Sequence, residues 1–278
     1  MRDSAVESVA VGFFDGVHLG HREILRRAGR VITFRNHPLS VLAPERAPRL
    51  VMTPEAKVAA IRECGVGDVE IEDFTPALAS LPPEEFAARR LCGADGRRLA
   101  IVCGENWRFG AGGRGDAAFL RSIGFVVEVV PSAVLDGERV SSSRIRRCLA
   151  EGDVEKAGAM MGRAFSLRGT RFAGKGVGAE IGFPTVNLRP EIPPPMRLGV
   201  YVAEVGGVRA LANCGVAPTM GTRAWTEPVV ELHFLGSPPD GDVMDVGFLR
   251  FLREERAFSS LDDLKAQISV DLSAAARG

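Results

Sequence analysis

The first half of the chain alternates short apolar runs with stretches of helical periodicity. Five apolar runs predict buried strands at 9–13, 31–34, 69–71, 99–103 and 125–130. Helical periodicity falls between them, at 20–29, 54–64, 82–92 and 116–122, and again at 142–150 and 153–161. Strands and helices in alternation indicate an α/β fold, a parallel sheet with helices on its faces, which binds ligands beyond the carboxyl ends of its strands.

The second half of the chain has a different pattern. After about residue 162 helical periodicity nearly vanishes, and glycine and proline become frequent. Short alternating runs at 200–205, 208–213 and 229–235 predict an antiparallel barrel or sandwich. The last segment, 259–276, is helical again, with Ser260 as its expected N-cap. Its apolar side chains form one stripe that we expect to pack on the barrel: Leu261, Leu264, Ile268 and Leu272. The chain therefore divides into domains 1–162 and 163–278.

Composition narrows the class of protein. The chain has 278 residues and a net charge of zero, which fits two globular domains and argues against a nucleic-acid-binding protein. There is no membrane-length apolar run and no signal-peptide pattern at the start, so we expect a cytoplasmic protein. The five scattered cysteines predict free thiols rather than disulfides or a zinc site. We expect small-molecule substrates, no membrane partner, and a monomer or weak homo-oligomer.

The first chemical feature is the segment Gly12–His21, which follows the first predicted strand. His18 and His21 lie three residues apart at a glycine-rich turn into a helix. Such a turn presents backbone amides to anions, and two imidazoles can stabilise charge on a reacting phosphate. From the residues alone, a rival hypothesis makes Asp15, His37 and this pair the metal ligands of a hydrolase, although a glycine-rich turn supports metal ligands poorly.

The second chemical feature lies in the segment 174–188. Gly174, Gly176 and Gly178 alternate with other residues and suit a loop that folds over phosphates with its amide groups, although barrel turns also collect glycine. Thr185 and Asn187 follow a proline and carry oxygen donors that suit magnesium.

These segments resemble the bacterial bifunctional riboflavin kinase/FAD synthetase family. Gly12–His21 is similar to the family's nucleotidyltransferase signature. Seven further segments match family motifs in the same order: 33–38, 102–110, 140–146, 182–187, 198–201, 213–219 and 230–233. Arg253, Glu254 and Phe258 lie in a stretch similar to the family's Arg-x-Glu-x-x-Phe segment. The resemblance covers essentially the whole chain.

The resemblance implies a Rossmann-like nucleotidyltransferase domain with a parallel sheet, followed by an antiparallel β-barrel riboflavin kinase domain with a C-terminal helix. The barrel domain would phosphorylate riboflavin with ATP to give FMN, and the first domain would adenylylate FMN to FAD with release of pyrophosphate. It implies His18 and His21 as catalytic residues for FAD formation and Glu231 as the base for the riboflavin hydroxyl.

The same resemblance implies the binding residues. ATP and its phosphates would contact Gly12, Phe14, Asp15, Gly20, Ser141, Ser142, Ser143, Arg144, Gly174, Gly176 and Gly178. The flavin would contact Asn106, Arg108, Arg253 and Phe258, and Mg2+ would bind Thr185 and Asn187.

Departures from the family pattern motivate alternatives. Phe13 replaces a small or polar residue, and Val177 and Ala179 stand where the kinase loop often carries arginine. One alternative is therefore an FMN adenylyltransferase with a weak or vestigial kinase domain. Another is a flavin-binding regulator without turnover, which the intact His18 and Glu231 argue against.

Overall fold

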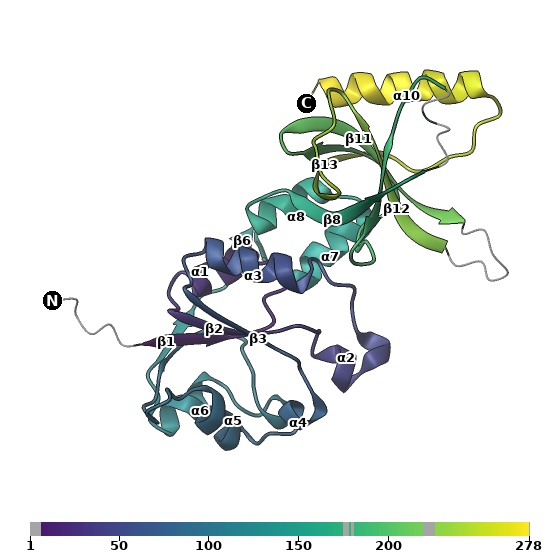
Figure 1. Cartoon of the computed structure of the whole chain (residues 1–278). Helices are drawn as coiled ribbons and strands as arrows, with labels where there is room; N and C mark the ends of the chain where they lie inside the picture. Colours follow the sequence, from purple (N-terminus) through teal and green to yellow (C-terminus); the bar gives the residue numbers. More distant parts are fainter. Residues whose placement is uncertain (1–6, 175–177, 179–180, 219–225, 278) are drawn as a thin grey trace. The chain divides into compact units, whose positions relative to one another are not determined.

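The chain forms two compact units, Met1–Ser142 and Ser143–Gly278 (Figure 1). The computed structural model describes residues 7–174, 178, 181–218 and 226–277. The predicted α/β fold with a second, β-barrel domain is confirmed by the strands and helices of the two units.

The first unit is built on a parallel sheet of five strands in the order β3-β2-β1-β4-β5. The strands are β1 (Ser8–Val11), β2 (Arg30–Phe34), β3 (Asp68–Glu72), β4 (Ala100–Gly104) and β5 (Val127–Val130). The strand order reverses between β1 and β4. In doubly wound folds, ligands bind in the crevice at the carboxyl ends of the two strands where the order reverses.

Helices cover both faces of this sheet. The helices are α1 (Leu19–Leu25), α2 (Leu39–Leu42), α3 (Pro54–Glu63), α4 (Pro76–Ala79), α5 (Pro83–Arg90) and α6 (Ala117–Ser122). α1 and α3 lie on one face, and α4, α5 and α6 on the other (Figure 1). Each face of the sheet has its own hydrophobic core, and alternate side chains of β1 point into the two cores. Val9 packs in the buried cluster that contains Phe86, and Ala10 packs in the buried cluster that contains Leu25. A sheet buried on both faces has strands that read as continuous apolar runs.

The helix boundaries follow local capping chemistry. The Thr53 hydroxyl accepts a hydrogen bond from the amide of Ala56 at 3.1 Å, which starts α3 at Pro54, and Gly65 follows its end at φ +95°. The Asp116 carboxylate caps α6 in the same way, by accepting from the amide of Phe119 at 2.8 Å. The sequence analysis missed the one-turn helices α2 and α4 and the small hairpin of β6 (Val134–Leu135) and β7 (Glu138–Arg139), because such short elements leave little periodicity.

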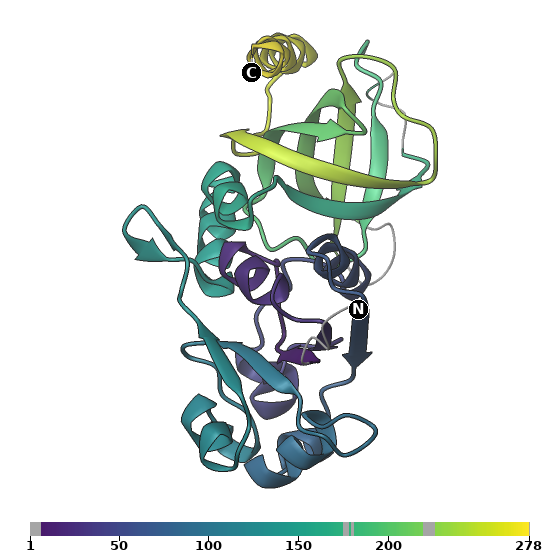
Figure 2. The same cartoon turned by 90° about the vertical axis from the view of Figure 1, so that its left-hand side faces the viewer.

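The second unit is a closed antiparallel barrel preceded by two helices and followed by one (Figure 2). Its strand order is β10-β11-β12-β9-β8-β13, so the barrel alternative is confirmed over the sandwich. The elements are α7 (Ser142–Glu151), α8 (Val154–Met161), β8 (Phe165–Phe172), β9 (Val186–Pro190), β10 (Gly199–Val205), β11 (Val208–Pro218), β12 (Thr226–Phe234), β13 (Val243–Arg253) and α10 (Leu261–Ala276). α8 contacts β8 and β13.

The C-terminal helix α10 packs on the outside of the barrel. Ser260 caps it, as predicted, by accepting a hydrogen bond from the amide of Asp263 at 3.1 Å. Of the predicted apolar stripe, Leu272 packs against the buried cluster that includes Val202, which Ala275, outside the predicted stripe, joins; Leu264 and Ile268 are partly buried. Leu261, at the first turn, remains 59% exposed, so the stripe prediction is wrong at that end.

The described residues include no helix with the length and apolar character needed to cross a membrane. All five cysteines are free thiols.

Candidate functional sites

The turn after β1 has an unusual backbone. Phe14 and Val17 adopt left-handed conformations at φ +53° and +39°, and Gly16 lies between them at φ +80°. Left-handed backbone at residues other than glycine costs about 1–3 kcal/mol and is concentrated at functional sites. A Cβ atom on Gly12 would lie 2.9 Å from the ring of Phe14, so only glycine leaves room for this arrangement.

Asp15 anchors the turn. Its buried carboxylate accepts from the amide of Val51, at 3.1 Å for Oδ1 and 3.0 Å for Oδ2, and its carbonyl accepts from the Ser142 hydroxyl at 2.8 Å. The Asp15 carboxylate is therefore directed at the protein's own backbone. The contact also places Ser142, from the segment expected to hold the triphosphate, beside the turn.

His18 and His21 form a stacked pair at the start of α1. Their ring centroids lie 3.5 Å apart with 17° between the planes, and the ring of Phe14 meets His21 edge-on at 5.2 Å. His18 is the N-cap of the helix, and its Nδ1 accepts from the amide of His21 at 3.2 Å. A Cβ atom on Gly20 would lie 3.3 Å from the His18 ring, which explains the glycine there.

The charge state of His18 follows from its burial. The side chain is 6% exposed. Burial, and next the positive charge of Arg139, lower the pKa of His18 to about 4. The ring is therefore neutral at pH 7. Because Nδ1 accepts a hydrogen bond, Nε2 carries the proton and is a hydrogen-bond donor.

The turn after β4 lies beside the turn after β1 in the sheet order. Here Asn106 is exposed, while Glu105 accepts from Ser132 at 3.0 Å from the amide and 2.6 Å from the hydroxyl. Arg108, expected at the flavin, donates to the carbonyl of Trp107 at 3.0 Å. Asn106 thus stands at the carboxyl end of β4, the strand next to β1 in the sheet.

The rest of the predicted triphosphate segment begins α7. Ser141 precedes the helix, while Ser143 and Arg144 belong to the second unit, where Arg144 is buried. Binding of the triphosphate by these residues stays a prediction.

The metal-hydrolase hypothesis finds no support. The Nδ1 atom of His37 accepts from the amide of Leu39 at 3.1 Å, and its ring packs against Phe13 with the centroids 4.8 Å apart. The Asp15 carboxylate accepts hydrogen bonds from the amide of Val51. Within the described ranges, no three histidine, cysteine, aspartate or glutamate side chains are grouped so that they could hold a metal ion.

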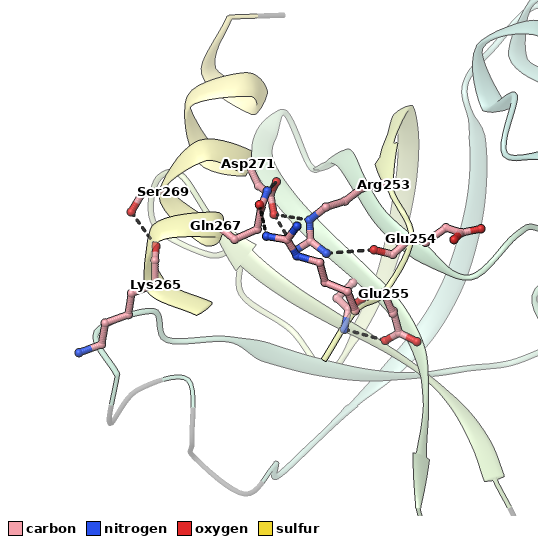
Figure 3. Close-up of polar contacts among 9 residues, drawn as sticks. Arg253, Glu254, Glu255, Lys265, Gln267, Ser269 and Asp271 are labelled. Atoms are coloured by element: carbon pink, nitrogen blue, oxygen red, sulfur yellow. Dashed lines mark hydrogen bonds and ion pairs between the residues drawn. The ribbon is translucent and has the colours of Figure 1, made fainter. Parts of the chain in front are cut away.

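In the barrel, three polar residues form a row across adjacent strands. Asn187 of β9 lies directly opposite Glu231 of β12, and Glu231 lies directly opposite Asn213 of β11. Directly opposed residues of antiparallel strands point their side chains to the same face. Glu255, just beyond β13, joins the row, because its carboxylate accepts from Nδ2 of Asn213 at 3.1 Å (Figure 3).

The environment of Glu231 raises its proton affinity. Its side chain remains accessible to solvent, but the atoms around the carboxylate still desolvate it, and this raises its pKa above the ordinary value. The negative charge of Glu255 acts in the same direction, whereas a hydrogen bond from Asn213 acts against it. A carboxylate of raised pKa is suited to accept a proton from a hydroxyl group.

The glycine segment packs against the two proposed magnesium ligands. A Cβ atom on Gly174 would lie 2.8 Å from Cγ of Asn187, and one on Gly178 would lie 3.2 Å from Oγ1 of Thr185. Asn187 lies in β9 and Thr185 directly precedes that strand, so the glycine segment meets both side chains. Hydroxyl, amide and carboxylate oxygens of Thr185, Asn187 and Glu231 fit the preference of Mg2+ for oxygen ligands. Gly176 lies outside the described residues.

The guanidinium group of Arg253 forms hydrogen bonds within the protein. Its Nε and Nη2 atoms donate to Oδ2 of the buried Asp271 at 3.0 and 2.8 Å, and Nη1 donates to the carbonyl of Glu254 at 3.0 Å (Figure 3). The guanidinium group also lies 5.8 Å from the ring centroid of Phe258. Arg253 therefore fixes the segment between β13 and α10, and Phe258 with it.

Comparisons with known proteins cover both units of the chain. Residues 2–144 match the family model described as FAD synthetase, and residues 161–277 match the one described as riboflavin kinase. A bifunctional riboflavin kinase/FMN adenylyltransferase from Escherichia coli (strain K12) is 33% identical over 286 residues, covering 95% of this chain and 90% of the relative. The relative of the same name from Bacillus subtilis (strain 168) is 28% identical over 298 residues, covering 99% and 93%.

The chain belongs to the bifunctional riboflavin kinase/FMN adenylyltransferase family. The family resemblance read from the sequence motifs is thereby confirmed. A crystal structure described as a macrolide-efflux protein from Streptococcus pneumoniae has a similar fold, with a TM-score of 0.86 and 28% identity, covering 99% of this chain and 95% of that one.

The sequence analysis of this bifunctional family member did not identify Glu255. Glu254 was assigned to the Arg-x-Glu-x-x-Phe segment, but the residue at the glutamate position is Glu255. The structure agrees with this correction, since Glu255 reaches Asn213 in the polar row, while the side chain of Glu254 pairs with Arg197. Counting positions from Arg253 would have found it.

Proposed function

We propose that the chain catalyses both reactions of its family, one in each unit. The barrel phosphorylates riboflavin with ATP to give FMN, and the parallel-sheet unit transfers an adenylyl group from ATP to FMN to give FAD and pyrophosphate. The observation that carries the proposal is the presence of two separate polar arrangements, the His18 and His21 pair at the end of β1 and the row of Asn187, Glu231 and Asn213 in the barrel.

In the kinase reaction, Glu231 accepts the proton of the riboflavin hydroxyl as that oxygen bonds to the γ-phosphorus of ATP. Its desolvated carboxylate, with raised pKa, supports this role. Thr185 and Asn187 would hold Mg2+, which supplies charge neutralisation on the phosphates when it is bound. Gly174 and Gly178 leave room for the backbone to approach these two side chains.

In the adenylyl transfer, a phosphate oxygen of FMN attacks the α-phosphorus of ATP, and the bond from that phosphorus to the departing pyrophosphate breaks. The phosphate oxygen is already a nucleophile, so no protein base is required. His18 donates from Nε2, and His21 lies stacked beside it, so both are placed to stabilise charge on the α-phosphate. Catalysis then rests on positioning and charge stabilisation.

The polar row favours an active kinase over the adenylyltransferase-only alternative. Glu231, Asn187 and Asn213 occupy matching register positions, as a working site requires. Val177 and Ala179, which motivated the alternative, lie outside the described residues. We further propose that the protein acts in the cytoplasm on small molecules, without nucleic acid, as a monomer or weak homo-oligomer; its free thiols fit a reducing compartment.

Product analysis tests the proposal. Purified protein is incubated with riboflavin, ATP and magnesium, and flavins are separated by chromatography. We expect FMN to appear first and FAD to follow, with pyrophosphate formed in step with FAD. If FMN and ATP yield FAD but riboflavin yields no FMN, the kinase half of the proposal is wrong.

A further inference from the structure

A lysine is buried at the carboxyl edge of the parallel sheet, and the reactions above make no use of it. Lys57 lies in the first turn of α3, and 2% of it is exposed. Its Nζ atom donates to the carbonyl of Phe34, the last residue of β2, at 2.5 Å. Burying an ammonium group is costly unless other groups compensate it, and buried titratable groups with perturbed pKa values cluster at functional sites.

A second contact ties Lys57 to the end of β1. Nζ lies 3.9 Å from the ring centroid of Phe13, which is a cation–π geometry. Phe13 is one of the residues that depart from the family pattern, and the Thr33 hydroxyl donates to its carbonyl at 3.1 Å. The ring also packs against His37. Lys57 therefore contacts the chain leaving β1 and the chain leaving β2 at the same time.

The charges around Lys57 act through space. Asp15, in the turn after β1, and Glu55, on α3 itself, favour its charged form, whereas Arg35, which follows β2, disfavours it. Burial is the largest effect; together with Arg35 it outweighs the two carboxylates and lowers the pKa of Lys57 to about 8. The ammonium form thus predominates at pH 7 and is lost over the next pH units.

We propose that Lys57 is a positioning residue for adenylyl transfer, whose charge holds the ends of β1 and β2 so that the turn between them presents His18 and His21 correctly. The inference rests on the proposed FAD synthesis. Lys57 lies against the Phe13 ring and is buried, so we assign it a positioning role rather than a catalytic one. A neutral side chain at this position loses both the cation–π contact and the charge-assisted hydrogen bond to the Phe34 carbonyl.

The first test is Lys57→Met, compared with Lys265→Met on the exposed surface of α10 as a matched control. We expect K57M to lower kcat for FAD formation about 10- to 100-fold, since small displacements of reacting groups have effects of that size. The KM for FMN and the kinase rate of the same molecule should not change. Because methionine fills the same space but leaves the Phe34 carbonyl without its side-chain donor, we expect Tm to fall by a few degrees while the protein stays folded.

The second test is the pH profile of the two activities. In the wild type, kcat for FAD formation should fall as the pH rises through about 8, because Lys57 loses its proton there. The kinase activity should lack this fall, and so should the residual FAD formation of K57M. A wild-type fall that persists unchanged in K57M contradicts the proposal.

Phe13→Leu extends the test to the partner ring. It keeps an apolar side chain but removes the aromatic face, so kcat for FAD formation should fall, and adding it to K57M should cause little further loss. If K57M does not fold, F13L alone decides: an unchanged kcat overturns the proposal. Wild-type kcat in K57M, or a loss shared equally by the kinase, also overturns it. If the wild type forms no FAD, the proposed function itself is wrong. That result differs from a failure of the Lys57 proposal, in which the wild type forms FAD and the variants do so equally well.

Discussion

Gly174→Ala tests whether the kinase depends on the position of the Asn187 side chain. A Cβ atom at residue 174 would lie 2.8 Å from Cγ and 3.2 Å from Oδ1 of Asn187, and closer still to Nδ2, whereas ordinary contacts of a Cβ lie at 3.4–4 Å. The amide must therefore move by roughly one ångström, out of line with Glu231 on the neighbouring strand. Rotation of a flexible side chain makes room at small cost.

The expected magnitude follows from that displacement. A misplacement of about 1 Å at a reacting centre costs on the order of 100-fold in rate, equivalent to about 2.7 kcal/mol of activation free energy. The free energy of unfolding should change by less than about 1 kcal/mol, because alanine also restricts the unfolded chain. The variant should therefore be a folded protein with a slow kinase, and its FAD formation from FMN should be normal.

The assay compares G174A with Gly236→Ala, the same substitution elsewhere in the barrel. A Cβ atom on Gly236 would meet Val208 at 3.5 Å, an ordinary contact. FMN formation is measured against riboflavin, ATP and magnesium concentrations, and Tm is recorded for both variants. Equal kinase rates in G174A and G236A would refute the placement of Asn187 in the site.

Three further predictions concern other parts of the two sites. His18→Asn and His18→Ala should both abolish FAD formation, but only the alanine variant loses the N-cap, so urea unfolding should show it about 1 kcal/mol less stable. Folding lowers the pKa of His18 from 6.5 to about 4, so the unfolded chain binds more protons than the folded chain between these pH values. The free energy of unfolding should therefore drop by about 3 kcal/mol as the pH falls from about 6.5 to 4. This contribution of His18 should be absent in H18N; an identical profile contradicts the assigned burial. Asp271→Asn leaves Arg253 without its carboxylate, so thermal unfolding should show a loss of about 1–2 kcal/mol and the kinase should slow while FAD formation persists.

Some of the fold could be read from the sequence because local chemistry determines it. The strands of the parallel sheet are buried on both faces, so they stand out as apolar runs. Thr53, Asp116 and Ser260 carry side chains that cap helices, and each helix begins where the cap predicts. The proximity of His18 and His21 was also predictable, because residues three apart at a helix start face one another.

Other features depend on contacts between distant segments. The alignment of Asn187, Glu231 and Asn213 requires the register of three strands, which no local pattern specifies. The burial of Lys57 depends on the Phe13 ring and the Phe34 carbonyl, from the ends of two different strands, both reaching its Nζ atom, although lysine is normally an exposed residue. Sequence pattern alone could find neither; the family resemblance supplied Glu231 but not Lys57.

The central claim is that two independent sites act in one chain, and one measurement tests it most directly. His21→Ala and Glu231→Gln are each supplied with riboflavin, ATP and magnesium, and separately with FMN, ATP and magnesium, and the flavin products are quantified. The account predicts that H21A accumulates FMN without FAD, and that E231Q makes FAD from FMN but no FMN from riboflavin. If either variant, shown to be folded by its circular dichroism spectrum, loses both reactions, the assignment of two separate sites is wrong.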